Sequence, residues 1–312
     1  MTAAMPAAIL ATHMPAHATT SDFFLDARLV RRAFDSASAG FDRHAAVHGE
    51  IRTRLLERLD VVRLEPASVL DLGAGTGQAT RALKRRYKNA HVVAVDLSPG
   101  MLAQAGKQSG FFQRFSRAAG DAQRLPFADA SFELIFSNLM LQWMGNPDAA
   151  IAEARRVLKP EGLFSFTSLG PDSLKELRQA WAMADDREHV HAFIDMHDLG
   201  DGLVRAGFVE PVMDTERLTV TYPDWPTLLG ELRGSGSTNL AHGRPRGLTG
   251  GAAAHRAQTA MAALRRNNVL PVSLEIVYGH AWVGVPRKRG RGGAEVSIPV
   301  ESLAGRRRSI MK

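Results

Sequence analysis

The 312-residue sequence contains no cysteine, and this absence excludes several classes of functional site. Thiolate catalysis, cysteine-bound zinc, iron–sulfur clusters and disulfide bonds all need the missing side chain. The sequence also has no run of about 18 uncharged apolar residues, which a membrane-spanning helix would need. Its content of apolar residues, 45%, and of charged residues, 23%, is typical of a soluble globular protein. We therefore expect one large domain with insertions and no membrane partner.

Charge is missing from the beginning of the chain and is concentrated at its end. Residues 1–20 contain no Asp, Glu, Lys or Arg, and prolines interrupt them where a secretory signal needs an unbroken apolar segment. We predict a disordered arm over residues 1–25 and a cytoplasmic protein, which the lack of cysteine also fits. Residues 286–312 carry eight basic and two acidic side chains but no aromatic residue that could stack on bases. We predict a disordered basic tail and no nucleic-acid partner.

Between these ends, the pattern of apolar residues predicts a helical segment at 26–65 and an α/β domain at 66–285. Strands are expected at 68–72, 91–96, 132–137 and 163–168, and another ends at 120–121. Helical segments separate these strands. Such alternation predicts a parallel sheet with right-handed crossovers.

After residue 170 the alternation becomes irregular. Helices are expected at 173–183, 196–206 and 252–266, and strands at 217–222 and 274–285. The segments at 171–195 and 223–270 contain long connections, so we predict that they are lid insertions over a substrate site. Five arginines in or beside the second segment can steer an acidic partner: Arg233, Arg244, Arg246, Arg265 and Arg266.

Polar and glycine residues at successive strand ends predict a cofactor site. Gly73, Gly75 and Gly77 separate a strand from a helix, where glycine permits positive φ and lets a ligand approach the backbone closely. Asp96 ends the next strand, where a carboxylate can accept hydrogen bonds from both hydroxyls of a ribose. Asp121 follows a third strand, where it can accept a hydrogen bond from an adenine amino group. The three features converge on one crevice at the carboxyl ends of the strands.

These motifs resemble those of the class I S-adenosylmethionine-dependent methyltransferases. The matching segments are VLDLGAGTG (69–77), VVAVDLSPGML (92–102), GDAQRLPFADASFELIFSNL (120–139) and RRVLKPEG (155–162). The resemblance implies a Rossmann-like, seven-stranded α/β sheet with helical lid insertions, and S-adenosyl-L-methionine as the cofactor. It implies these cofactor-binding residues: Asp71, Gly73, Gly75, Gly77, Asp96, Leu97, Asp121 and Ala122.

Less generic segments resemble the malonyl-carrier-protein O-methyltransferases of biotin synthesis. They are RAFDSASAGFDRHA (32–45), SNLMLQWMGNP (137–147), TSLGPDSLKELRQAW (167–181), LRGSGSTNL (232–240), GLTG (247–250) and LPVSLEIVYGHAWVG (270–284). The resemblance implies methyl transfer to the free carboxylate of a malonyl thioester, carried by acyl-carrier protein or coenzyme A. The product would be the methyl ester that starts pimeloyl synthesis. Many members have Tyr where this chain has Phe41, so the chain lacks a hydroxyl that could contact substrate there.

The expected acceptor is a carboxylate that is already ionised at pH 7, so the reaction needs no general base. We expect catalysis by positioning of the reacting atoms and exclusion of water. Candidates for the acceptor pocket are Phe41, Asn138, Gln142 and Trp143. Gln142 would orient the carboxylate by hydrogen bonding, and Trp143 would either exclude water or simply pack in the core.

Other histidines and acids suggest no further site. His44 and His48 are four residues apart, but no third ligand and no H-E-x-x-H motif accompany them, so we predict no metal. Residues 185–189 are expected to form an exposed polar turn. Two alternative functions remain open: a related methyltransferase-fold protein that modifies arginine in a partner, and a non-enzymatic cofactor-binding protein that uses the basic tail.

Overall fold

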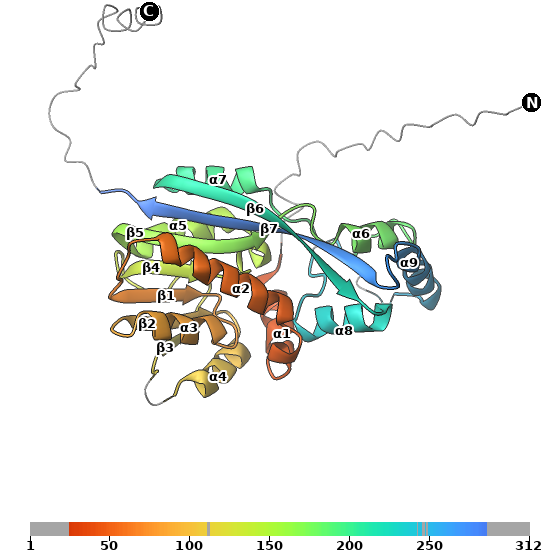
Figure 1. Ribbon diagram of the computed structural model, residues 1–312, viewed down its shortest axis with the longest axis horizontal. Coiled ribbons are helices and arrows are strands. Elements are labelled where there is room, and N and C mark those ends of the chain that lie inside the picture. The colour runs from red at the N-terminus through yellow and green to blue at the C-terminus, as the bar shows by residue number, and fades with distance from the viewer. Residues whose placement is uncertain (1–24, 111–112, 242, 245–246, 248, 286–312) are drawn as a thin grey trace, which may run out of the picture.

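The computed structural model describes residues 25–110, 113–241, 243–244, 247 and 249–285. Within these residues, seven strands form one mixed sheet in the order β3-β2-β1-β4-β5-β7-β6 (Figure 1). Strands β1 to β5 pair in parallel, and β7 is antiparallel to both of its neighbours, β5 and β6. The expected Rossmann-like α/β sheet is therefore confirmed. The strands are β1 (Ser68–Leu72), β2 (His91–Asp96), β3 (Ser116–Ala119), β4 (Phe132–Ser137), β5 (Leu158–Leu169), β6 (Phe208–Tyr222) and β7 (Leu270–Val283).

Helices cover both faces of the sheet and one of its ends. They are α1 (Ala27–Ala37), α2 (Ala46–Arg58), α3 (Gln78–Arg86), α4 (Pro99–Gln108), α5 (Pro147–Val157), α6 (Lys175–Ala182), α7 (Met196–Arg205), α8 (Trp225–Gly234) and α9 (Gly251–Ala263). Three short 3-10 turns complete them: η1 (Phe41–Arg43), η2 (Leu59–Val61) and η3 (Leu141–Trp143). No helix in the described part of the chain is long and apolar enough to cross a membrane.

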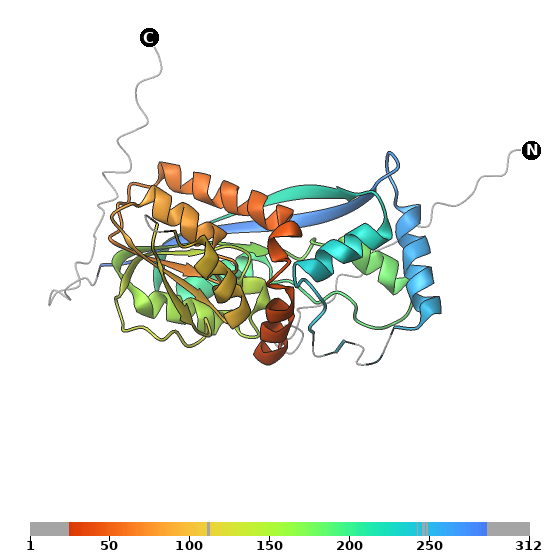
Figure 2. The same cartoon turned by 90° about the horizontal axis from the view of Figure 1, so that it is seen from below.

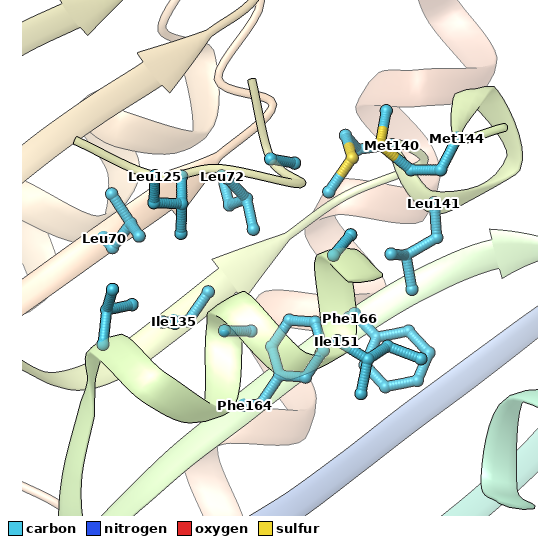
Figure 3. Close-up of a cluster of buried hydrophobic side chains, with 14 of the residues drawn as sticks. Leu70, Leu72, Leu125, Ile135, Met140, Leu141, Met144, Ile151, Phe164 and Phe166 are labelled. Atoms are coloured by element: carbon cyan, nitrogen blue, oxygen red, sulfur yellow. The ribbon is translucent and has the colours of Figure 1, made fainter. Parts of the chain in front are cut away.

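The central strands contribute side chains to two separate hydrophobic cores, because successive side chains of a strand point to opposite faces of the sheet. Leu70, Ile135 and Phe164 are buried on the face that α5 and α7 cover, where Figure 3 shows them close together. Val69 and Leu134 are buried on the other face, beneath α2, α3 and α4. Because both faces of these strands are buried, nearly every residue in them is apolar, and each strand appears in the sequence as an almost continuous apolar run.

Side-chain caps fix where several helices around the site begin. The side chains of Ser98, Asn146 and Asp224 each accept a hydrogen bond from a backbone N–H in the first turn of α4, α5 and α8. A proline follows each cap within two positions, where its missing N–H costs no helical hydrogen bond.

Helices α6, α8 and α9 gather at one end of the molecule, beside the ends of β6 and β7 (Figure 1). They share a third hydrophobic core, which includes Leu177, Leu228, Met261 and Leu270. All three helices lie in the two segments predicted as lids. Helix α8 was not expected from the sequence, because its apolar residues are mixed with proline and glycine.

Several boundaries differ from the sequence expectations, and three of them have a clear structural reason. Leu25, placed at the end of the disordered arm, is buried and forms an isolated β-bridge with Ala241, so the arm ends before it. Strand β6 extends back to Phe208, through an irregular register at Val209–Val212 that hides the strand pattern. Strand β5 begins at Leu158 and takes in residues 159–162, which the sequence suggested as a turn. Residues 1–24, the predicted basic tail at 286–312 and Arg246 lie outside the described residues.

The close packing of Gly279 on Phe166 gives a prediction about stability. A Cβ atom at Gly279 would lie 2.3 Å from Cζ of Phe166, so Gly279→Ala overpacks the core. We expect a loss of about 1–3 kcal/mol in the free energy of unfolding, measured in urea. Gly230→Ala is the matched control, because no atom lies within 4 Å of its added Cβ and alanine favours the helix. Equal stability of the two variants would contradict the packing argument.

Candidate active site

The carboxyl ends of β1, β2 and β4 open onto two adjoining hollows, which together we call the glycine-loop cavity. Phe41, His48, Gly73, Gly75 and Asn138 line both hollows. Most of the residues implied as cofactor ligands meet here. One hollow is lined by Gly73, Gly75, Asp96, Leu97, Asp121 and Ala122, and the other by Asp71, Gly73 and Gly75.

The glycines of the loop serve different purposes. Gly73, Gly75 and Gly77 all have positive φ, which other residues rarely adopt. At Gly75 a Cβ atom would meet nothing within 4 Å, so the loop leaves open space for a ligand beside its backbone. At Gly77 a Cβ would lie 2.8 Å from that of Ala105, and Gly77 lines neither hollow. Gly77 therefore allows the close packing of α3 on α4, and a role of this glycine beside the cofactor stays a prediction.

Asp96 is held in place by the backbone and keeps its carboxylate at the cavity. Its two oxygens accept hydrogen bonds from the N–H groups of Gly75 and Ser98, each at 2.8 Å. Burial raises the pKa of Asp96 to about 6, against the lowering effect of these hydrogen bonds. Asp121 lines the same hollow, and one of its oxygens accepts from Gln123 N–H at 2.9 Å. Each carboxylate can accept further hydrogen bonds from a ligand.

Asp71 and Arg52 place opposite charges beside the glycine loop. Burial raises the pKa of Asp71 to about 7, although the Thr80 hydroxyl donates a hydrogen bond to it. Partial burial also lowers the pKa of Arg52, while the nearby Asp42 and Asp71 oppose that shift. Arg52 makes no hydrogen bond or ion pair within the described chain, so its guanidinium can receive an anionic group of a ligand. No motif in the sequence pointed to Arg52.

Two carboxylates attach the N-terminal segment to the cavity. Asp35 of α1 accepts hydrogen bonds from the Ser98 hydroxyl and the Gly100 N–H, at the turn that follows Asp96. Asp42 of η1 accepts from the side chains of Thr76 and Gln78, in and just after the glycine loop. These contacts hold α1 between the sheet and the lid helices, as Figure 2 shows in dark red.

A second cavity of about 350 Å³ lies between the sheet and the lid helices, and we call it the lid cavity. Most of its lining side chains are apolar, and α6, α8, β6 and β7 contribute many of them, such as Leu177, Leu228 and Val272. The lid cavity and the glycine-loop cavity share three lining residues: His48, Leu139 and Trp143. The two cavities therefore adjoin at these three residues, which we call the junction.

The structure divides the four predicted acceptor-pocket residues between the two cavities. Gln142 lines the lid cavity and Trp143 lines both. Phe41 and Asn138 line the glycine-loop cavity instead. The Trp143 ring is 7% exposed and makes an edge contact with Phe34 at 5.2 Å, so it packs in the core and also walls the junction.

The turn after β4 uses its own polar groups internally. Leu139 has a φ of 54°, a strained conformation for leucine, and its carbonyl accepts a hydrogen bond from the Gln142 amide nitrogen at 2.8 Å. The oxygen of that amide is buried without a partner. Asn138 donates to the His48 carbonyl at 3.2 Å and accepts from the Thr167 hydroxyl at 3.0 Å. The Gln142 amide thus closes the turn on itself, and the Asn138 amide joins the turn to α2 and β5.

Two further histidines line the lid cavity, and the sequence did not indicate either. His191 is 7% exposed, its Nε2 has no partner, and burial lowers its pKa to about 4. His189 stacks on the Trp181 ring at 3.9 Å and hydrogen-bonds with Asp185 at 2.8 Å. The expected exposed polar turn at 185–189 is therefore wrong at His189, because the stacking buries its ring.

The arginines of the second lid segment do not act as one group. Arg233 is exposed, lines the lid cavity and makes no hydrogen bond or ion pair within the described residues. Arg244 and Arg265 donate to backbone carbonyls of their own segment.

The part of the chain that the structure describes contains no group of three or more His, Asp or Glu that could hold a metal.

Comparisons with known proteins agree with this arrangement. A family model described as a methyltransferase domain matches residues 70–166. The chain is 46% identical over 278 residues to a malonyl-acyl-carrier protein O-methyltransferase of Laribacter hongkongensis, covering 86% of this chain and 94% of the relative. It is 44% identical over 290 residues to a protein of the same name from Halorhodospira halophila, covering 91% and 97%.

Solved structures with lower identity share the fold. The YcgJ protein of Bacillus subtilis superposes with a TM-score of 0.55 at 16% identity, covering 75% of this chain and 99% of that one. A phosphoethanolamine N-methyltransferase 2 of Haemonchus contortus, in complex with S-adenosyl-L-methionine, has a TM-score of 0.52 at 18% identity and covers 86% and 61%.

The raised pKa of Asp96 predicts pH-dependent binding of S-adenosylhomocysteine, the probe that the sequence motifs suggest. Below pH 6 the free protein carries a proton on Asp96, and binding through the ionised carboxylate must release it. We expect the dissociation constant to rise by up to about tenfold for each pH unit below 6, measured by calorimetry from pH 5 to 8. In a folded Asp96→Asn variant, affinity at pH 8 should fall by about 1.5–3 kcal/mol and the transition near pH 6 should disappear. Equal wild-type affinity at pH 5 and 8 would refute this role.

Proposed function

The chain belongs to the family of malonyl-acyl-carrier protein O-methyltransferases, and on this basis we propose that it methylates the free carboxylate of a malonyl thioester. S-adenosyl-L-methionine supplies the electrophilic methyl group when it is bound. The product is a malonyl methyl ester, whose masked carboxylate can enter pimeloyl synthesis for biotin. We place this reaction in the cytoplasm.

The observation that best supports this function is the junction of the two cavities at His48, Leu139 and Trp143. A thioester in the lid cavity can present its far end there to a group held beside the glycine loop. The walls are largely apolar, and they remove water from the carboxylate and thereby increase its reactivity. A malonyl carboxylate has a pKa near 4 and needs no base to remove a proton.

We assign the glycine-loop cavity to the cofactor on the basis of its donors and acceptors. Asp96 accepts from the ribose hydroxyls and Asp121 from the adenine amino group, with Leu97 and Ala122 beside the ring. The open backbone at Gly75 leaves room for the methionyl part. The methionyl carboxylate would pair with the guanidinium of Arg52.

An acyl-carrier protein suits the entrance of the lid cavity as the malonyl carrier. Carrier proteins are acidic and present substrate on a phosphopantetheine arm, and the largely apolar lid cavity can take such an arm. Arg233 places an exposed positive charge where the arm would enter. That charge favours an acidic partner over a neutral one.

The nature of the acceptor gives the test of this function. Malonyl-carrier protein should gain the mass of one methyl group, whereas acetyl-carrier protein, which has no free carboxylate, should not. Single-turnover rates should be flat from about pH 6 to 8 once the cofactor is saturating, because the nucleophile is already ionised. Comparable methylation of the acetyl thioester, or a steep dependence on a group that titrates near pH 7, would contradict the proposal. An arginine-containing protein as the better acceptor would favour the arginine-directed alternative.

The charge of Arg233 gives a second prediction, which concerns the carrier. Arg233→Glu should raise KM for malonyl-carrier protein roughly threefold to tenfold at low salt, and the effect should shrink as salt screens the charges. Arg63→Glu makes the same charge change on an exposed residue that precedes β1 and does not line the lid cavity. That control should leave KM unchanged. Equal effects of the two variants would mean that only net charge matters.

A further inference from the structure

We propose that Nε2 of His48 donates the hydrogen bond that holds the malonyl carboxylate at the junction of the two cavities. This inference rests on the function proposed above and deepens it. From the sequence we expected Gln142 to make this hydrogen bond. One N–H of the Gln142 amide donates to the Leu139 carbonyl, and its buried oxygen would repel a carboxylate. Gln142 also lines the lid cavity but not the glycine-loop cavity, so a donor at the junction comes from a residue that both cavities share.

His48 lies where that donor is needed. It lines the lid cavity and both hollows of the glycine-loop cavity. Leu139 and Trp143 are the other residues that both cavities share, and Leu139 has no side-chain donor. A carboxylate at the junction consequently has two side-chain N–H groups to choose from, on His48 and on Trp143.

The two ring nitrogens of His48 have different surroundings. Nδ1 is shielded from solvent and has no hydrogen-bond partner within the described residues. Nε2 has no partner there either, but it is not among the shielded atoms. A proton on Nδ1 would be buried without an acceptor, whereas a proton on Nε2 can be satisfied by a ligand. These surroundings therefore favour the neutral tautomer with its proton on Nε2, where a ligand can accept the hydrogen bond.

The ring is neutral at physiological pH. Burial, and to a smaller extent the positive charge of Arg52, together lower the pKa of His48 to about 4. Phe41, Leu139 and Trp143 around the ring carry no charge, so nothing on these neighbours restores the proton. His48 thus acts as a neutral donor and not as a cation.

A neutral donor suits this reaction. The carboxylate oxygen forms a bond to the methyl carbon as the carbon–sulfur bond breaks, and the bonding electrons stay on sulfur. No proton moves, and the negative charge of the carboxylate is consumed. A cation at this position would stabilise the charged reactant more than the transition state, whereas a neutral N–H orients the oxygen with a smaller penalty.

Neighbouring residues hold the His48 ring in position. The Phe41 ring makes an edge contact with it at a centroid distance of 5.3 Å. Asn138 donates to the His48 carbonyl and is itself held by the Thr167 hydroxyl. Asn138 is therefore a positioning residue, which acts on the acceptor through His48.

The experiment compares replacements that keep or remove an N–H at each ring nitrogen. The amide nitrogen of glutamine occupies the place of Nε2, and that of asparagine the place of Nδ1. His48→Gln should keep kcat/KM for malonyl-carrier protein within about threefold of wild type. His48→Leu and His48→Asn should each lower it by roughly 10- to 100-fold, mostly through a higher KM, because the lost bond is strongest to the charged reactant.

Calorimetry with S-adenosylhomocysteine supplies the second measurement. Its dissociation constant should change less than threefold in all three variants, which also shows that they are folded. Full activity of His48→Leu, equal activity of the Gln and Asn variants, or a loss of cofactor affinity that matches the loss of activity would each overturn the proposal. So would a loss confined to Trp143→Phe, which removes the competing N–H. Failure of the wild type to methylate malonyl-carrier protein would instead refute the proposed function.

Discussion

The parallel pairing of β1 with β2 and β4 is the constraint on which the whole site depends. Parallel neighbours end at the same edge of the sheet, so the residues that follow each strand are brought together. The pairing continues beyond the strands, because the N–H groups of Gly73 and Ala74 both donate to the Val95 carbonyl. Asp96 then accepts from Gly75, which joins the acid of one strand to the loop of another. A shift in this register would separate all of these groups.

Carboxylates outnumber basic side chains around the glycine-loop cavity. Asp42, Asp71, Asp96 and Asp121 line it together with Arg52, and this excess of acids favours a positively charged ligand there. Burial, and repulsion by a neighbouring carboxylate in each case, raise the pKa values of Asp71 and Asp96. The lid cavity is largely apolar, and its charged lining residues are Glu231 and Arg233. The charges of the lining therefore favour the cationic donor at the glycine-loop cavity, whereas the lid cavity has no such excess of either sign.

Closure of the site joins segments that are distant in the chain. Asp35 and Asp42 attach the N-terminal segment to the sheet side. On the lid side, a Cβ atom at Gly234 would overlap the His44 ring, and one at Gly236 would lie 3.0 Å from the Phe34 ring. Glycine at these two positions therefore lets the lid approach the N-terminal segment closely. The enclosed volume excludes water from a reaction in which a bare carboxylate is the nucleophile.

The sequence by itself determined the sheet and its glycine loop. Strands β1, β2 and β4 follow from short apolar runs, and the loop at Gly73–Gly75 follows from local backbone requirements, so neighbouring residues are sufficient to predict them. The sequence also placed Asp96 and Asp121 at strand ends that a parallel sheet must bring together. The motifs indicated the family for the same reason, because its cofactor residues lie within these local segments.

Only the tertiary structure decided which side chains line the two cavities and which are used in hydrogen bonds within the protein. Gln142 and Asn138 have amides that the sequence could assign equally to a ligand or to the chain, and packing gave both of them internal partners. His48 and Arg52 come from a helix about ninety residues earlier. His48 reaches the junction, and Arg52 reaches the glycine-loop cavity, because α2 packs on the sheet. The side chains of a helix show their period in the sequence, but not the partner that each will face. Long-range contacts settle that question, since they depend on how the whole chain folds.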